Sequence, residues 1–530
     1  MLSPGNGGSA PVYGHALGHA TYERHRPEQT LLYQLVEKHY PAVVEQLEFQ
    51  GKSLPTHVHR EFEAYLKCGR LEHGFLRVRC DKCHFERLVA FSCKKRGFCP
   101  SCGARRMAET AALLSDEVFP DVPLRQWVIS FPFPLRYLFA AHPQAMGKVL
   151  GIICRAISTH LLHKAGYRLK DGATGAVTLI QRFGSALNLN IHFHILFLDG
   201  VYVYRDNRPP RFKRVKAPAK DELEDLVQLI SRRVGRCLER QGLLEQDAES
   251  AWLDLDPAED TDAMPQILGS SVSYRIAVGP QQGRKAFMIR TIRPLDRPDP
   301  GLERVAKANG FSLHAGVSCE GRQKNKRERL CRYIARPPVA VPRLSLSSTG
   351  KVVYTLKTPY RESLPHERSE CFGHGTTQVA FEPVDFIARL AALVPKPRVN
   401  LTRYHGVLAP NHRWRGLVTP AKRGKDVKPI ADREVRSPAE RHAAMTWAQR
   451  LKRVFNIDIG VCGRCGGSVR IVACIEDQNI IDRILAHLES KEQNPPALPH
   501  LAPPTRAPPE TLPLFAGSES KITILNQQGR

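Results

Sequence analysis

Two Cys-x2-Cys pairs near the amino terminus constrain this chain more than any other feature. Cys80 and Cys83 form the first pair, and Cys99 and Cys102 form the second, with fifteen residues between them. Each pair places two thiolates on one tight turn, and two pairs complete the tetrahedral ligand set that structural zinc prefers. Inside a reducing cell, paired cysteines more often bind metal than form disulfides. The sequence therefore predicts one structural zinc site made by these four residues.

Two further cysteines lie close to these pairs. Cys93 stands between the pairs, and Cys68 precedes them. Cys93 could replace one of the four ligands, or a second ion could use Cys68, His73 and Cys93.

A third Cys-x2-Cys turn, Cys462 and Cys465, lies near the carboxyl end, and Cys474 follows nine residues later. Three cysteines are one ligand short of a closed zinc shell, which His487 could complete. This turn is either a second zinc site or an empty turn.

The charge of the chain indicates its partner. Lys and Arg number 78 against 52 Asp and Glu, a formal net charge of +26 and a pI of about 9.7. Such an excess favours a polyanion, most often nucleic acid, and basic residues surround the first two cysteine pairs. With 42% apolar and 25% charged residues the chain can bury a sizeable core, and no apolar run approaches the roughly 18–20 residues that span a bilayer. We expect a soluble cytoplasmic protein that binds DNA.

Hydrophobic periodicity gives the fold class. It predicts helices over 144–165, 220–240 and 383–394, and strands over 177–180, 191–198 and 312–319. This mixture predicts an α+β fold. A helical pattern also follows Leu31, with Pro41 expected to break it.

A length of 530 residues suggests about three or four domains. We predict a helical leader over 1–65, a zinc-binding and DNA-binding module over 66–110, and an α+β domain over 120–395. Inside that domain, residues 241–268 carry eight acids and no Lys or Arg, which indicates a solvated surface insertion. A basic region with the second cysteine turn follows over 396–490, where aromatic side chains could stack on single-stranded DNA. A proline-rich, disordered tail is expected over 491–530.

A histidine pair lies inside the most apolar predicted strand. His192 and His194 flank Phe193, and because alternate side chains of a strand share one face, the two imidazoles point the same way. Such a pair is a platform for a divalent metal ion. Gln181, at the end of a neighbouring predicted strand, is the best candidate for a third ligand. Asp199 is a poorer one, since it lies an odd number of residues beyond His194.

A tyrosine lies on a strongly basic predicted helix. Helical spacing puts Arg329, Tyr333 and Arg336 on roughly one face, and Pro337 is expected to end the helix. A tyrosine framed by guanidinium groups is suited to attack a phosphate, because the arginines stabilise the charge that develops there. The alternative is a packed tyrosine on a helix whose basic face only holds DNA.

These motifs occur together and in a characteristic order. The cysteine module comes first, then Gln181-Arg-Phe-Gly184 with His192-Phe-His194 and Asp199-Gly200, and then Arg332-Tyr-Ile-Ala-Arg-Pro-Pro338. Over roughly residues 60–480 the chain resembles the IS-ninety-one (IS91) family of rolling-circle transposases, including the common-region element group. Leu401 to Pro410 also resembles that family.

The resemblance implies a histidine-hydrophobe-histidine (HUH) nuclease domain, an antiparallel sheet with helices packed on one face. It implies that His192 and His194 bind Mg²⁺ or Mn²⁺ and that Tyr333 is the nucleophile. The activity it implies is nicking of single-stranded DNA and strand transfer through a 5′-phosphotyrosine, in the cytoplasm of a bacterium. The sequence has no Gly-x4-Gly-Lys-Ser/Thr loop, which argues against a built-in helicase.

The chain departs from part of the family. Some members carry two tyrosines four residues apart, but the position four before Tyr333 is Arg329. This favours a one-tyrosine scheme, with Tyr360 and Tyr404 as less favoured second nucleophiles. Two rivals remain: a rolling-circle replication initiator or relaxase with the same chemistry, and a zinc-dependent DNA-binding protein without catalysis.

Overall fold

A six-stranded antiparallel sheet forms the centre of the protein. The computed structural model describes residues 20–21, 26–204, 209–246, 251–253, 261–286, 288–293, 304–361, 373–422, 457–458 and 460–492. The strand order is β13-β14-β4-β7-β6-β18, and every neighbouring pair is antiparallel. The strands are β13 (Val305–Ala308), β14 (Phe311–Cys319), β4 (Leu124–Ser130), β7 (Leu189–Leu198), β6 (Gly175–Phe183) and β18 (Thr402–Gly406).

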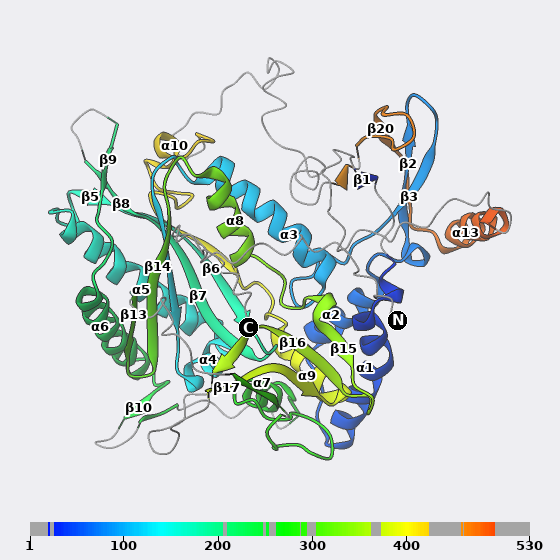
Figure 1. Ribbon diagram of the computed structural model, residues 1–530, viewed down its shortest axis with the longest axis horizontal. Coiled ribbons are helices and arrows are strands. Elements are labelled where there is room, and N and C mark those ends of the chain that lie inside the picture. The colour runs from blue at the N-terminus through cyan, green and yellow to red at the C-terminus, as the bar shows by residue number, and fades with distance from the viewer. Residues whose placement is uncertain are drawn as a thin grey trace, which may run out of the picture.

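Helices cover both faces of this sheet (Figure 1). One face, with Trp127 and Phe193, packs against α4 (Phe133–Ala141), α5 (Pro143–Lys164) and α6 (Lys220–Glu239). The other face, with Leu179 and Leu196, packs against α3 (Pro100–Leu113) and α8 (Lys324–Ile334). The expectation of helices on one face only is therefore wrong, because β6 and β7 are apolar on both sides and need two covers.

Helix α5 is the one helix of the described residues that is long and apolar enough to cross a membrane by length and composition. In this protein 56% of its most apolar window is buried, and it packs on the sheet and on α6. Burial of this kind is typical of a core helix.

A second antiparallel sheet, of order β12-β17-β16-β15, lies beside a group of helices. Helix α9 contacts both α1 and α7 there, and the Arg182 guanidinium of the central sheet donates to the last carbonyls of α9. These elements are β12 (Met288–Arg293), β15 (Leu344–Leu346), β16 (Val352–Arg361), β17 (Gly373–Phe381), α1 (Leu31–Phe49), α2 (Thr56–Lys67), α7 (Met264–Val272) and α9 (Pro383–Leu393).

A three-stranded ribbon, of order β20-β2-β3, pairs an amino-terminal segment with a carboxyl-terminal one (Figure 1). Strand β2 (Phe75–Cys80) pairs with β3 (Glu86–Ala90) on one side and with β20 (Val469–Ile475) on the other. Helix α13 (Gln478–Glu492) follows β20 and contacts the 3-10 turn η2 (Leu71–His73). The predicted boundary that assigned 396–490 to a separate region therefore divides segments that the structure joins.

Short elements complete the structure. They are the 3-10 turns η1 (Pro27–Gln29) and η5 (Val341–Arg343), the π-turn η3 (Leu114–Val118), the helix α10 (Arg415–Val418), and the strands β1 (Ala20–Thr21), β5 (Gly172–Ala173), β8 (Gly200–Val203), β9 (Arg211–Arg214), β10 (Glu245–Gln246), β11 (Ala251–Trp252) and β19 (Ile457–Asp458).

The elements predicted from periodicity are confirmed, but two details are wrong. Helix α1 continues through Pro41, because this residue faces solvent, where water can take the place of the lost backbone hydrogen bond. The acidic segment 241–268 is not wholly a surface insertion, since Met264, Ile267 and Leu268 belong to the buried face of α7. The tail from residue 493 and the segment 423–456 of the basic region lie outside the described residues.

Candidate functional site

The histidine pair lies on the face of β7 that packs against α3 and α8. The Nε2 atoms of His192 and His194 are 3.1 Å apart, and the two ring planes are inclined at 65°. His194 is 5% exposed. The alternation of the strand therefore places both imidazoles side by side, as the sequence predicted.

Each imidazole is held through its Nδ1 atom. His192 Nδ1 donates to the backbone carbonyl of Asn190 at 2.9 Å. Gln126, from the neighbouring strand β4, places its Nε2 at 2.7 Å from His194 Nδ1 and donates to it. These bonds direct both Nε2 atoms toward the same point between the rings.

Burial keeps the two imidazoles neutral. It lowers the pKa of His192 to about 4 and lowers the pKa of His194 further below its ordinary value, and the positive charge of Arg336 acts in the same direction on both. A neutral imidazole has a free nitrogen lone pair, which is the form that binds metal ions.

Gln181 lies next to the pair, as the sequence predicted, because it stands opposite His192 in the β6–β7 ladder. Its Nε2 donates to the backbone carbonyl of Ile334 on α8, and its Oε1 is buried without a hydrogen-bond partner among the described residues. A buried carbonyl oxygen beside two imidazole nitrogens is a donor set that fits a divalent cation.

Asp199 takes no part in this group. Its carboxylate accepts two hydrogen bonds from Arg125, at 2.9 and 2.7 Å, and both side chains are about 5% exposed or less. The odd spacing from His194 correctly predicted that Asp199 turns away.

Helix α8 brings Tyr333 to the same part of the molecule. The Arg336 guanidinium lies 4.4 Å from the centre of the Tyr333 ring and 5.4 Å from that of Phe183, and it donates to the Tyr333 carbonyl. Tyr333 is half-buried and precedes Ile334, whose carbonyl binds Gln181. The tyrosine, the arginine and the histidine pair therefore form one neighbourhood, which we call the histidine–tyrosine site.

The arginines of α8 divide into two kinds. Arg329 is half-buried one turn before Tyr333. Arg327, by contrast, is 1% exposed and donates to the carbonyls of Ser115 and Pro120. Arg327 therefore anchors the helix, which is a role that sequence spacing did not indicate. The helix ends at Ile334, before Pro337, as predicted.

Two residues near the pair were missed by the sequence analysis. Gln126 is one, and His314 on β14 is the other, in the same cross-strand row as Val128 and His194. Burial lowers the pKa of His314, and its charge in turn lowers the pKa of His194. The strand pattern placed His314 on a predicted strand, but only the strand order β14-β4-β7 reveals that both residues lie near the histidine pair.

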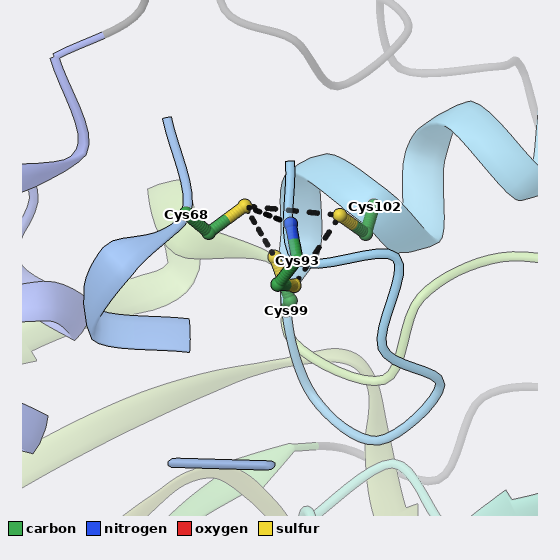
Figure 2. A group of neighbouring side chains, drawn as sticks. All are labelled: Cys68, Cys93, Cys99 and Cys102. Atoms are coloured by element: carbon green, nitrogen blue, oxygen red, sulfur yellow. Dashed lines mark hydrogen bonds between the residues drawn. The ribbon is translucent and has the colours of Figure 1, made fainter. Parts of the chain in front are cut away.

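The cysteines form two separate clusters of four. In the first, which we call the inner cluster, Cys68, Cys93, Cys99 and Cys102 bring their sulfur atoms within 4.8 Å of one another (Figure 2). The Sγ of Cys102 lies 3.4 Å from that of Cys93 and 3.7 Å from that of Cys68. Cys68 follows α2, and Cys99 and Cys102 lie at the start of α3.

The second group, the outer cluster, consists of Cys80, Cys83, Cys462 and Cys465. Its Sγ–Sγ distances are 3.5 Å from Cys80 to Cys465 and 3.5 Å from Cys83 to Cys462. The two halves of this cluster are contributed by the opposite ends of the chain.

The prediction of one zinc site made by Cys80, Cys83, Cys99 and Cys102 is therefore wrong. The β2–β3 hairpin carries the first pair away from the second, and the β2–β20 ladder supplies Cys462 and Cys465 in its place. Both Cys93 and Cys68 are needed to complete the inner cluster. The alternatives with His73, Cys474 or His487 do not arise, since all three are exposed and none joins a cluster. Four thiolates at these separations fit tetrahedral structural zinc in both clusters.

Two family models match the chain. One, described as "Putative transposase", matches residues 175–415, and the other, described as "Transposase zinc-binding domain", matches residues 35–131. The first range contains the histidine pair and Tyr333, and the second contains the whole inner cluster. No curated protein and no solved structure matches the chain in the same comparisons.

These matches define the protein as a transposase, an enzyme that binds and cleaves DNA, with structural zinc in its cysteine clusters. The zinc-binding domain is that of one group in particular, and the chain belongs to the IS91 family of transposases. The matched zinc-binding domain begins at residue 35, so it includes residues 35–65 of the segment that the sequence analysis treated as a helical leader.

Proposed function

We propose that this transposase nicks single-stranded DNA with Tyr333 and transfers the strand through a 5′-phosphotyrosine, in rolling-circle-type transposition in the cytoplasm. The observation that carries the proposal is the pair of Nε2 atoms of His192 and His194, which face each other at 3.1 Å. Two neutral imidazoles whose Nε2 atoms converge in this way can direct both nitrogens at one divalent ion.

His192, His194 and Gln181 would hold a divalent ion, Mg²⁺ or Mn²⁺. When bound, such an ion polarises the scissile phosphate and orients it. The three residues supply two nitrogen donors and one oxygen donor, and the buried, unpartnered Oε1 of Gln181 supports its inclusion.

Tyr333 would act as the nucleophile. Its hydroxyl loses a proton to water, the phenolate oxygen forms a bond to phosphorus, the bond from phosphorus to the 3′ oxygen breaks, and the 3′ oxygen takes up a proton from water and leaves as a hydroxyl group. Arg336, stacked on the tyrosine ring, would stabilise the charge that develops on the phosphate oxygens. Arg329, one turn earlier on α8, would contact the DNA backbone on the same side.

The sequence of α8 supports a cycle with a single tyrosine, because Arg329 occupies the position of the second one. Tyr404 lies on β18, where it is half-buried in the core between α3 and the sheet, and burial raises its pKa. Those features suit a packing role. The side chain of Tyr360 lies outside the described residues.

The test is covalent capture of labelled single-stranded DNA from the end of the element, with Mg²⁺ or Mn²⁺, by the full-length protein. We expect a metal-dependent adduct that is lost in Tyr333→Phe and in His192→Ala/His194→Ala. Tyr404→Phe is the matched control, because Tyr404 also has an arginine, Arg415, 5.4 Å from its ring centre. This control should keep the adduct.

Three results would contradict part or all of this proposal. An adduct that survives Tyr333→Phe would move the nucleophile to another residue. DNA binding without any adduct, in a folded protein on its correct DNA end, would favour a zinc-dependent DNA-binding protein without catalysis. An adduct formed only at a replication origin, and never at an element end, would favour a replication initiator or relaxase.

A further inference from the structure

The outer cluster is built from two parts of the chain that are about 380 residues apart. Cys80 and Cys83 lie at the end of β2, and Cys462 and Cys465 precede β20. The matched zinc-binding domain ends at residue 131, so it does not include the second half of this cluster.

The carboxyl-terminal half has a backbone shaped for this contact. Gly466 has a φ of +70°, and its N–H donates to the carbonyl of Cys462, which closes the turn. A Cβ added to Gly467 would lie 3.0 Å from the Sγ of Cys80, so only glycine lets the two turns approach.

Besides the backbone ladder of β2 with β20 and the contact of α13 with η2, the side-chain contacts between the two segments are polar. Asp81 accepts from Ser468 at 3.0 Å and pairs with Arg470 at 2.9 Å, and both arginine and aspartate are largely exposed. Exposed ion pairs of this kind contribute little to stability.

Apolar burial is equally small on this side. Among residues 460–492, the buried hydrophobic side chains are Cys462 and Ile481, while Ile471 is 64% exposed on β20. Since apolar burial and surface ion pairs are both weak here, the four thiolates are the strongest side-chain link that adds to the β2–β20 ladder in holding residues 460–492 to the ribbon.

The two clusters also differ in their access to solvent. In the inner cluster, Cys68, Cys99 and Cys102 are 4–5% exposed within the main core, beside α2 and α3, and Cys93 is partly exposed. In the outer cluster, Cys80 and Cys462 are buried, but Cys83 is exposed and Cys465 is partly exposed. A chelator in solution can therefore reach the outer cluster through its exposed ligand Cys83, whereas the inner cluster has no exposed ligand and lies against the main core.

We propose that Cys80, Cys83, Cys462 and Cys465 bind a zinc ion that clips residues 460–492 onto the amino-terminal ribbon, and that this ion is released before the ion of the inner cluster. Release frees β20 and α13 and leaves the inner cluster, α3 and the central sheet in place. The proposal concerns the zinc ions alone and does not depend on the nicking chemistry.

The test uses the full-length, zinc-loaded protein. Zinc per chain is counted by mass spectrometry during timed exposure to a chelator, and hydrogen exchange is followed in β20, in α3 and in β7. We expect two ions at the start, then one, with the first loss accompanied by at least about tenfold faster exchange in β20 only. Simultaneous loss of both ions, or loss of one ion with unchanged exchange in β20, would overturn the proposal.

Three variants give an independent test. Cys465→Ser should bind one ion and expose β20, whereas Cys465→His should keep two, because a histidine nitrogen also ligates zinc. Cys474→Ser is the matched control, since Cys474 is an exposed thiol of β20 that belongs to neither cluster, and it should keep two ions. Two ions in a folded Cys465→Ser protein would refute the assignment.

Discussion

Replacing Gln126 by leucine would test how the histidine pair is prepared for a divalent ion. Gln126 donates to His194 Nδ1, so the ring proton of His194 lies on Nε2 and is directed at His192 Nε2, 3.1 Å away. His192 completes the chain by donating from Nδ1 to the Asn190 carbonyl. All the polar hydrogens of the pair are thus satisfied in this arrangement.

Binding a divalent ion through both rings requires both Nε2 lone pairs, so the His194 proton must move to Nδ1. A half-turn of the Gln126 amide then offers Oε1 as the acceptor, since a glutamine carries a donor and an acceptor on one planar group. Leucine offers neither. The buried N–H of His194 would be left unpaired, which costs about 1 to 3 kcal/mol.

The measurement is calorimetric titration of the DNA-free protein with Mn²⁺. We expect Gln126→Leu to weaken binding by about 10- to 100-fold, equivalent to about 1.4 to 2.7 kcal/mol. Gln126→Glu should bind at least as tightly as the wild type, because a carboxylate accepts from Nδ1. Asn190→Ala is the control, since Asn190 holds His192 through its backbone carbonyl, and it should change the affinity by less than about twofold.

Equal Mn²⁺ affinity in the leucine, glutamate and wild-type proteins would refute this reasoning. A lower melting temperature of Gln126→Leu with unchanged Mn²⁺ affinity would also refute it, and would assign Gln126 to packing alone.

Three further predictions concern the framework. Gly103→Val should displace the end of α8, since an added Cβ would lie 2.6 Å from the Cβ of Pro337. We expect less adduct at unchanged zinc content and a free energy of unfolding about 1 to 3 kcal/mol lower by chemical unfolding. Full adduct formation by this variant would contradict the prediction. Arg125→Met should lower the free energy of unfolding by about 3 to 5 kcal/mol, because it leaves the Asp199 carboxylate buried and unpaired, and urea titration tests this. Burial raises the pKa of Glu61, so the folded protein holds this proton more tightly than the unfolded chain and its contribution to stability falls as pH rises through the folded pKa. Glu61→Gln should therefore flatten the decline in melting temperature as the pH rises above 4.5, the ordinary pKa of a glutamate, and an unchanged slope would be inconsistent with that cause.

The features predicted well from sequence are those set by local geometry. His192 and His194 share a face because side chains alternate along any strand, and α8 stops before Pro337 because proline restricts the residue before it. Gln181 was found next to His192 for a related reason, since sequential strands are usually neighbours.

The features that were missed depend on which distant segments pair. Neither Gln126 nor His314 could be assigned to the site without the order β14-β4-β7. The assignment of cysteines to zinc sites was wrong for the same reason. The pair that begins at Cys80 could be completed by the Cys-x2-Cys pair at Cys99 or by the one at Cys462, and only the β2–β20 ladder decides between them. The metal-ligand roles of His192, His194 and Gln181, and the role of Tyr333, remain predictions.

The composition of the outer cluster imposes an order on biosynthesis. The last ligand of the inner cluster is Cys102, so that zinc site can close early, while the outer site must wait for Cys465. At about 5–20 residues per second, the 363 residues between these positions take roughly 20–70 s to translate. During that interval Cys80 and Cys83 are present as an incomplete pair on a nascent chain. The completed ribbon therefore marks a chain whose central sheet has already left the ribosome.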